Sequence, residues 1–250
     1  MKDGISVIIP CYNENKSHDL YERLSMVYSY LKDNFTTFEL ILVDDGSNDK
    51  TFLVCSDFIK GSISRTEVRL VISLEHFGKG HAIKEGIKVA KFSTILFMDA
   101  DLAVPLSFIK YFFNQMKNNS CLVGERRTFK ENRSSWSPIK RKISLLCTFC
   151  VNKLLPLSLK DSQCGFKMFN VKEVDNILAL CKSNGFMFDA ELLAYLYSSG
   201  VKIIDIPVWW NNRKSGSVCW CDWIDSFIDL LKISWRFQFR NKVVDRWEKS

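Results

Sequence analysis

The first hundred residues alternate short apolar runs with segments of helical spacing. The apolar runs cover residues 5–9, 39–43, 68–74 and 93–98. Apolar side chains recur at helical intervals in segments 17–32 and 80–91. An alternation of strand and helix predicts an α/β fold with a Rossmann-like, doubly wound and mostly parallel sheet.

The alternation of strand and helix is less regular after residue 100. The pattern predicts helices over 107–117, 138–155, 174–181 and 190–197, and strands over 121–124 and 202–208. In segment 222–239, one helical face carries Ile224, Phe227, Ile228, Leu231 and Trp235, and the opposite face is charged. With no internal repeat or linker, we expect one domain over 1–220 and a C-terminal amphipathic helical extension over 221–250.

The composition limits the partners and the location. A formal charge of +7 on 250 residues is modest for nucleic-acid binding, which we do not expect, but it suits phosphates or an acidic membrane surface. The N-terminus does not resemble a signal peptide, and no run reaches the roughly 18 apolar residues of a membrane span. These features predict a cytoplasmic protein, or one bound peripherally to the cytosolic face of a membrane. Nine cysteines in such a chain are expected to be reduced thiols.

Four polar clusters follow apolar runs, at residues 11–14, 44–47, 75–80 and 99–101. In a parallel sheet, ligands bind beyond the carboxyl ends of the strands. The clusters are therefore expected to meet in one site. Their coincidence is stronger evidence than any single motif.

The triplet Asp99-Ala100-Asp101 is the candidate metal site. Carboxylates two residues apart on an extended segment point the same way, and their oxygens suit Mg²⁺ or Mn²⁺, which take further ligands from substrate phosphates. The alternative is an ordinary acidic loop. The neighbouring clusters favour the metal.

Two other clusters are candidates for nucleotide contacts. Asp44 follows the second strand, where a carboxylate can bind a ribose or a base, although an Asx turn explains the same residues. Gly78-Lys79-Gly80 precedes a helix whose N-terminus attracts phosphate, with a plain helix-start turn as the alternative.

The later clusters are basic or mixed. Arg126 and Arg141 are suited to phosphate, whereas a solvated basic surface is the alternative. Asp161 and Asp189 stand beside aromatic residues, and Asp189 can also be a helix N-cap.

Together these segments resemble the inverting family-2 glycosyltransferases of the GT-A fold, especially their polyprenyl-phosphate branch. The matching segments are SVIIPCYNE (6–14), VDDGS (43–47), GKG (78–80), DAD (99–101), DSQCGFK (161–167), FDAELL (188–193) and IPV (206–208). The last three are most similar to the dolichyl-phosphate glucosyl branch. The resemblance covers about residues 4 to 220.

The resemblance implies a role for each matching residue. The nucleotide sugar would be bound by Pro10, Tyr12, Glu14, Asp44, Lys79, Gly80, Asp99, Ala100, Asp101 and Arg126. Metal would be held by Asp99 and Asp101, and acceptor phosphate by Arg126 and Arg141. The catalytic group would comprise Asp101, Asp161, Gln163 and Asp189. This chain departs from the family in having His76-Phe77 in place of Asn-Arg and His81 in place of a glycine.

The implied reaction is a single displacement that moves a sugar, glucose from UDP-glucose first of all, onto dolichyl or another polyprenyl phosphate. An acceptor phosphate is already anionic, so Asp161 and Asp189 are expected to orient the reactants more than to move a proton. The alternatives are mannosyl transfer from GDP-mannose and transfer to a soluble saccharide, for which Asp161 or Asp189 would act as a base. A nucleotidyltransferase would need a glycine-rich loop near the N-terminus, which is missing, and a non-catalytic scaffold would not need acids at every strand end.

A lipid acceptor requires contact with a membrane. Segments 138–155 and 222–239 are basic or aromatic amphipathic helices, which can lie in the membrane interface without spanning it. The alternative is that both apolar stripes pack against the protein core. We expect peripheral membrane contact, with the endoplasmic reticulum as the site in a eukaryote.

Overall fold

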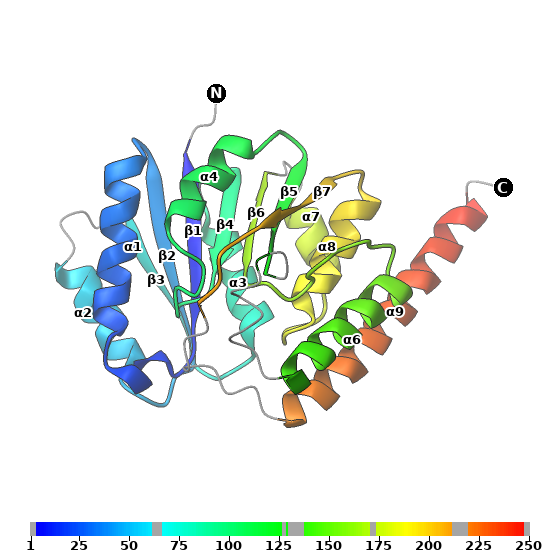
Figure 1. Cartoon of the computed structure of the whole chain (residues 1–250), viewed down its shortest axis with the longest axis horizontal. Helices are drawn as coiled ribbons and strands as arrows, with labels where there is room; N and C mark the ends of the chain where they lie inside the picture. Colours follow the sequence, from blue (N-terminus) through cyan, green and yellow to red (C-terminus); the bar gives the residue numbers. More distant parts are fainter. Residues whose placement is uncertain are drawn as a thin grey trace.

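The structure is a computed structural model that describes residues 4–61, 67–126, 129, 138–170, 174–211 and 220–247. A seven-stranded sheet forms its centre, in the order β3-β2-β1-β4-β6-β5-β7 (Figure 1). The strands are β1 (Ile5–Cys11), β2 (Phe38–Asp45), β3 (Val68–Ser73), β4 (Thr94–Met98), β5 (Ser120–Glu125), β6 (Phe166–Asn170) and β7 (Lys202–Pro207). The helices are a short 3₁₀ turn (Glu14–Ser17), α1 (Leu20–Asn34), α2 (Thr51–Gly61), α3 (Lys79–Val89), α4 (Ser107–Gln115), α6 (Pro138–Leu154), α7 (Val174–Leu180), α8 (Phe188–Ser198) and α9 (Trp220–Trp247).

Strands β1 to β4 form the parallel part of the sheet. Strand β1 lies between β2 and β4, and β3 pairs with β2, all in parallel. Their carboxyl ends therefore meet at one edge, which is the lower edge in Figure 1. The predicted α/β class and the mostly parallel sheet are confirmed.

Strand β6 interrupts the parallel arrangement. It pairs antiparallel with both β4 and β5, and β5 pairs parallel with β7. The sequence pattern did not predict this strand, nor helix α2. The remaining helices and strands agree with the predictions to within a few residues at their ends, apart from α9, which begins at Trp220 and continues to Trp247.

Alternating side chains of the central strands enter two cores. Val7 and Leu42 pack with helices α1, α2 and α4 on one face of the sheet, whereas Ile8 and Val43 pack with α3 and α8 on the other. Burial on both faces explains why these strands are mostly apolar and do not alternate apolar with polar residues.

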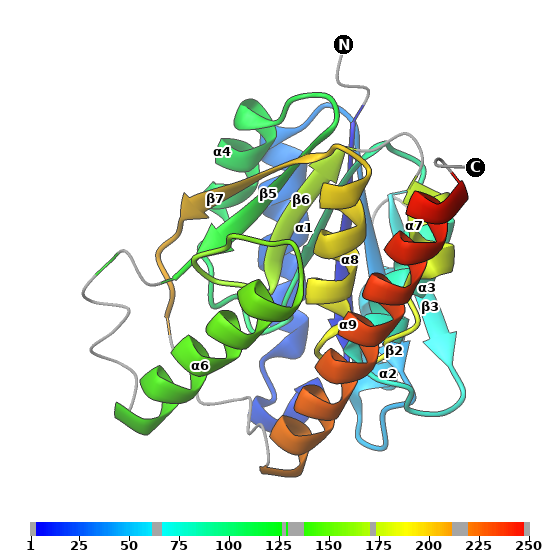
Figure 2. The ribbon, with the colours of Figure 1, turned by 90° about the vertical axis from the view of Figure 1, so that its right-hand side faces the viewer.

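Helices α6 and α9 lie side by side at the end of the molecule that faces the viewer in Figure 2. They are joined where the Ser234 hydroxyl donates to the Leu154 carbonyl at 3.1 Å. Leu230, Ile233 and Phe237 anchor α9 in the core shared with α3 and α8. Within the described ranges, no helix combines the length and the apolar character needed to cross a membrane.

Candidate active site

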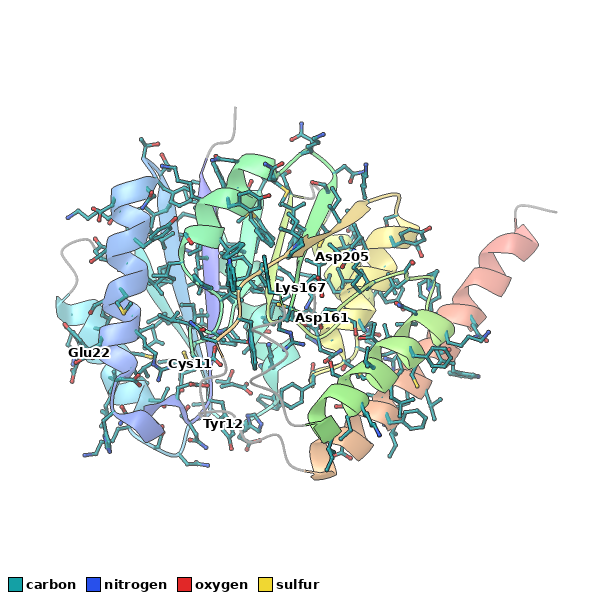
Figure 3. The ribbon with its side chains drawn as sticks, viewed as in Figure 1. Cys11, Tyr12, Glu22, Asp161, Lys167 and Asp205 are labelled. Carbon is teal, nitrogen blue, oxygen red and sulfur yellow. The ribbon has the colours of Figure 1, made fainter. Side chains whose placement is uncertain are left out.

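A cavity of about 560 Å³ opens at the carboxyl ends of β1, β2 and β4. Its walls include residues 10–14 after β1, the turn before α3, the triplet after β4, and part of α9. Figure 3 shows Cys11 and Tyr12 where β1 reaches this edge. Three of the four polar clusters contribute residues 10–14, 76–79 and 99–101 to the cavity, and the fourth contributes Asp45.

The triplet Asp99-Ala100-Asp101 forms one wall. The Lys79 ammonium lies 2.5 Å from Oδ1 of Asp99, and the Ala103 backbone N–H donates to Oδ1 of Asp101 at 3.0 Å. A Cβ on Gly165 would lie only 2.0 Å from Oδ2 of Asp99. The absence of a side chain at Gly165 therefore makes room for the Asp99 carboxylate.

Negative charge accumulates on this wall. Burial raises the pKa of Asp101, and the nearby Asp99 charge raises it further. Burial also raises the pKa of Glu14, against the opposing effect of Arg23, with the Asp101 and Asp99 charges adding to the increase. Burial lowers the pKa of Lys79, but the charges of Asp99 and Asp189 raise it by more. Mutually repelling carboxylates beside a held ammonium favour the arrival of a cation.

The donor set fits a magnesium-type ion. Asp99 and Asp101 supply hard carboxylate oxygens, and such ions commonly take one or two carboxylates and complete their shell with water and substrate phosphate. Within the described part of the chain, no group of three His, Cys, Asp or Glu residues could hold an ion unaided.

A second wall is aromatic. The rings of Tyr12 and His76 stack with centroids 3.6 Å apart and planes 16° from parallel. His76 Nδ1 lies 2.8 Å from Oδ2 of Asp45, and the same oxygen accepts the backbone N–H of Gly78 at 2.6 Å. Asp45 thus fixes the turn that carries His76.

Asp45, and not the predicted Asp44, reaches the cavity. Side chains alternate along β2, and Asp45 shares the face of Val43, on the side of α3. Asp44 points to the opposite face, and both carboxylates are almost fully buried, Asp44 with 2% and Asp45 with 1% exposure. Burial raises the pKa of Asp44.

The N-terminus of α3 is partly occupied by another segment of the chain. The His81 N–H donates to the Asn184 carbonyl at 3.1 Å. A Cβ on Gly78 would lie 2.6 Å from that oxygen, and one on Gly80 would lie 2.3 Å from Cβ of Phe188. Both glycines therefore admit the segment before α8, and Gly78 also has a φ of 110°. The His81 N–H, at the N-terminus that was predicted to bind phosphate, is therefore already bonded within the protein.

The predicted acceptor-end residues form buried ion pairs away from the cavity lining. Arg126 holds Asp161 through two contacts, of 2.7 and 2.9 Å, and Asp161 is fully buried. The Gln163 N–H donates to Asp161 at 3.2 Å. Lys167 lies 2.7 Å from Asp189, and Figure 3 shows Lys167 and Asp161 inside the fold, away from Tyr12. The side chain of Arg141 lies outside the described part of the structure.

Helix α9 supplies a wall that the sequence did not predict. Asp225, Ser226 and Asp229 line the cavity, and the Ser183 hydroxyl donates to Asp229 at 3.2 Å. The charged face of the helix thus turns toward the site. The sequence spacing predicted this charged face, but it did not predict that the face would point toward the cavity.

Comparison with known proteins identifies the family to which this sequence belongs. Residues 6–178 match Glycosyl transferase family 2. The chain belongs to this family. It is therefore a sugar-transferring enzyme, as the motifs predicted.

Curated relatives extend the similarity over most of the chain. A dolichyl-phosphate beta-glucosyltransferase of Trichomonas vaginalis is 30% identical over 92% of this chain and 72% of its own length. The dolichyl-phosphate beta-glucosyltransferase of Homo sapiens is 29% identical over 93% of this chain and 75% of its own.

Solved structures support the fold. Glucosyl-3-phosphoglycerate synthase from Mycobacterium tuberculosis, in complex with uridine diphosphate, has a TM-score of 0.62 at 16% identity and covers 92% of this chain and 80% of its own. Mannosyltransferase PcManGT from Pyrobaculum calidifontis, in complex with GDP-Man and Mn²⁺, has a TM-score of 0.51 at 19% identity, covering 81% of this chain and 54% of its own. The predicted GT-A fold is confirmed.

Proposed function

We propose that this enzyme transfers glucose from UDP-glucose to dolichyl or another polyprenyl phosphate, with Mg²⁺ or Mn²⁺ bound at Asp99 and Asp101. The observation that carries the proposal is the cavity at the strand ends, where this acidic triplet faces the Tyr12–His76 stack. The names of the relatives support the sugar and the acceptor. The Mn²⁺ in solved glycosyltransferases of the same fold supports the metal.

The donor would lie along the cavity from the aromatic wall to the triplet. Tyr12 and His76 line the cavity and offer ring faces on which a nucleobase can stack. Pro10 and Glu14 continue that wall, and Asp45 supplies the carboxylate of β2 nearest to the donor. The diphosphate would then reach Lys79, whose ammonium now pairs with Asp99.

When bound, the metal supplies positive charge that stabilises the leaving diphosphate. Asp99 and Asp101 would hold it, with Ala100 setting their spacing. With a cation held at Asp99 and Asp101, the Lys79 ammonium, which pairs with Asp99 in this structure, would be available to a phosphate oxygen. Gly80 admits Phe188 and so lets the segment before α8 pack against the N-terminus of α3.

At the acceptor end, charge placement matters more than proton transfer. A phosphate acceptor is anionic near neutral pH and needs no strong base. Asp161 and Asp189 are buried in ion pairs with Arg126 and Lys167, so we assign them an orienting role. Gln163 stands beside the first pair, and we assign Arg141, on α6, to the acceptor phosphate.

We further propose that α6 and α9 meet an anionic membrane surface. Among the described side chains of these helices, the large apolar ones that are exposed are Ile139, Leu145, Leu146 and Phe149 of α6 and Phe227, Ile228, Leu231 and Trp235 of α9. The predicted apolar stripe of α9 is thus exposed from Phe227 to Trp235, and a different face packs on the core; Ile224 lies outside the described side chains. Exposed Lys142 and Lys153 accompany the apolar side chains of α6, as an interfacial helix requires.

Transfer assays test the proposal directly. Radiolabelled UDP-glucose and GDP-mannose are incubated separately with the enzyme and Mn²⁺, with and without dolichyl phosphate. We expect label from UDP-glucose in the organic phase only when dolichyl phosphate is present. Label from GDP-mannose instead would identify a mannosyltransferase, and label that stays in the aqueous phase on a saccharide would indicate a soluble acceptor.

A further inference from the structure

Arg23 joins two walls of the cavity from behind. It lies in the first turn of α1 and is only 3% exposed. Its guanidinium donates to the Ala100 carbonyl at 2.6 Å and to the Glu14 carbonyl at 2.9 Å. It also contacts the carboxylates of Asp19, at 3.0 Å, and Glu14, at 3.5 Å.

Helix stability does not account for this residue. A cation in the first turn faces the positive end of the helix dipole, which is unfavourable. Burying a guanidinium adds a desolvation cost that only good partners offset. Asp19 precedes the helix, but the other partners lie in the two loops that line the cavity.

The loop held by Arg23 has an unusual backbone. Leu102, directly after the triplet, has a φ of 52°, a conformation that few residues other than glycine adopt. Such strain persists only where surrounding contacts enforce it. The bond to the Ala100 carbonyl fixes the peptide between Ala100 and Asp101, within the triplet.

We propose that Arg23 is a positioning residue that sets the geometry of the divalent-cation site and so of the donor diphosphate. The inference rests on the proposed function, because it assumes a cation at Asp99 and Asp101. By holding Ala100 and Glu14 together, Arg23 keeps the loops after β4 and β1 at a fixed separation. These strands are neighbours in the sheet, so one side chain can span both loops.

The charge and the geometry of Arg23 predict opposite effects on cation binding. Its positive charge opposes a divalent cation, so removing that charge alone would strengthen binding. Its hydrogen bonds order the ligands, so removing them would weaken binding. A lysine keeps the charge but lacks the planar guanidinium that makes several hydrogen bonds at once. A methionine removes the charge and the hydrogen bonds.

The test compares Arg23→Lys and Arg23→Met with the wild-type full chain. Mn²⁺ binding is measured by electron paramagnetic resonance in the presence of UDP, and UDP binding is measured by calorimetry with Mn²⁺ and with a chelator. Arg69→Met is the matched control, because Arg69 also donates to a carbonyl, Val89 at 2.7 Å, and pairs with a glutamate, Glu39 at 3.5 Å, at the opposite end of the strands. Urea unfolding of each variant reports its stability separately.

Both Arg23 variants should bind Mn²⁺ at least tenfold more weakly, and Arg69→Met should bind like the wild type. The variants should lose UDP affinity in the presence of Mn²⁺ but little in the presence of chelator, a split that general destabilisation does not produce. Unchanged or tighter Mn²⁺ binding in either folded variant would overturn the inference. If Arg23→Met does not fold, Arg23→Lys decides. A wild-type enzyme that binds no Mn²⁺ would instead refute the metal in the proposed function, and this inference with it.

Discussion

The two halves of the sheet use charged side chains in opposite ways. Around β1 and β4, the carboxylates of Asp99 and Asp101 end at the cavity, open to a ligand. Around β6, Lys167 is fully buried against Asp189, which is 4% exposed. The first half keeps charge available for binding, whereas the second uses charge to fix the fold.

This contrast has a physical reason. A carboxylate at the mouth of a cavity stays partly hydrated, so a cation or a substrate can change its partner at low cost. A buried ion pair has lost its water, and either member left alone is strongly unfavourable. Substitutions in the buried half should therefore lower mainly the free energy of unfolding, whereas substitutions in the open half should lower mainly ligand binding and the rate of transfer.

The largest effect is expected in the buried half. Lys167→Met should lower the free energy of unfolding by about 3–5 kcal/mol, because the Asp189 carboxylate would remain buried without its cation. Urea unfolding followed by circular dichroism measures the change. Lys88→Met is the control, since Lys88 pairs with Glu85 at the surface and should cost no more than about 1 kcal/mol. Equal costs for the two variants would remove the contrast between the halves.

The complementary change in the open half is Asp99→Asn. Sugar transfer should fall by about 100-fold or more, because the metal loses a carboxylate ligand and the leaving diphosphate loses charge stabilisation. The unfolding free energy should change by no more than about 1 kcal/mol, since the Asp99 side chain is 44% exposed. Steady-state transfer assays test the first expectation. Asp57→Asn, on α2, should leave the rate unchanged, and a fully active Asp99→Asn enzyme would refute the assignment of the triplet.

A smaller effect is expected at the aromatic wall. His76→Ala removes the ring stacked on Tyr12, and such a contact contributes about 0.5–1.5 kcal/mol. We expect UDP to bind roughly 2- to 10-fold more weakly. Calorimetry measures the affinity, with Tyr111→Ala on α4 as the control. Tighter binding in His76→Ala would show that the imidazole occupies the place of the base.

The smallest effect on folding is expected at the surface of α6 and α9. The double variant Phe149→Ser and Trp235→Ser should change the unfolding free energy by about 1 kcal/mol or less, because both side chains are exposed. It should sediment severalfold less with anionic vesicles. Met26→Ser and Leu53→Ser remove exposed apolar side chains from α1 and α2 and serve as the control. Equal sedimentation of the two double variants would contradict a membrane role for α6 and α9.

Sequence patterns predicted the parallel half of the sheet well, because each of its strands is a short run of mostly apolar residues. They missed β6, since Lys167, its second residue, is typical of a loop until its partner Asp189, 22 residues later, is placed beside it. They missed α2 because only Thr51, Cys55 and Phe58 of that helix are buried, so its core-facing positions include small and polar side chains.

The candidate site shows the same limit. The triplet and residues 10–14 were predicted because local sequence places them at strand ends. The choice between Asp44 and Asp45 depends on which face of β2 borders the cavity. The roles of Arg23 and of α9 depend on contacts across the fold, which no local pattern carries.

The central claim is that the cavity binds a nucleoside diphosphate through a cation held by Asp99 and Asp101. Calorimetric titration of UDP into the wild-type enzyme, with Mn²⁺ and then with a chelator, tests it most directly, with Asp101→Asn as the companion variant. We predict binding with Mn²⁺ that weakens at least tenfold in the chelator and to a similar extent in Asp101→Asn. Binding of equal strength in all three conditions would contradict the claim.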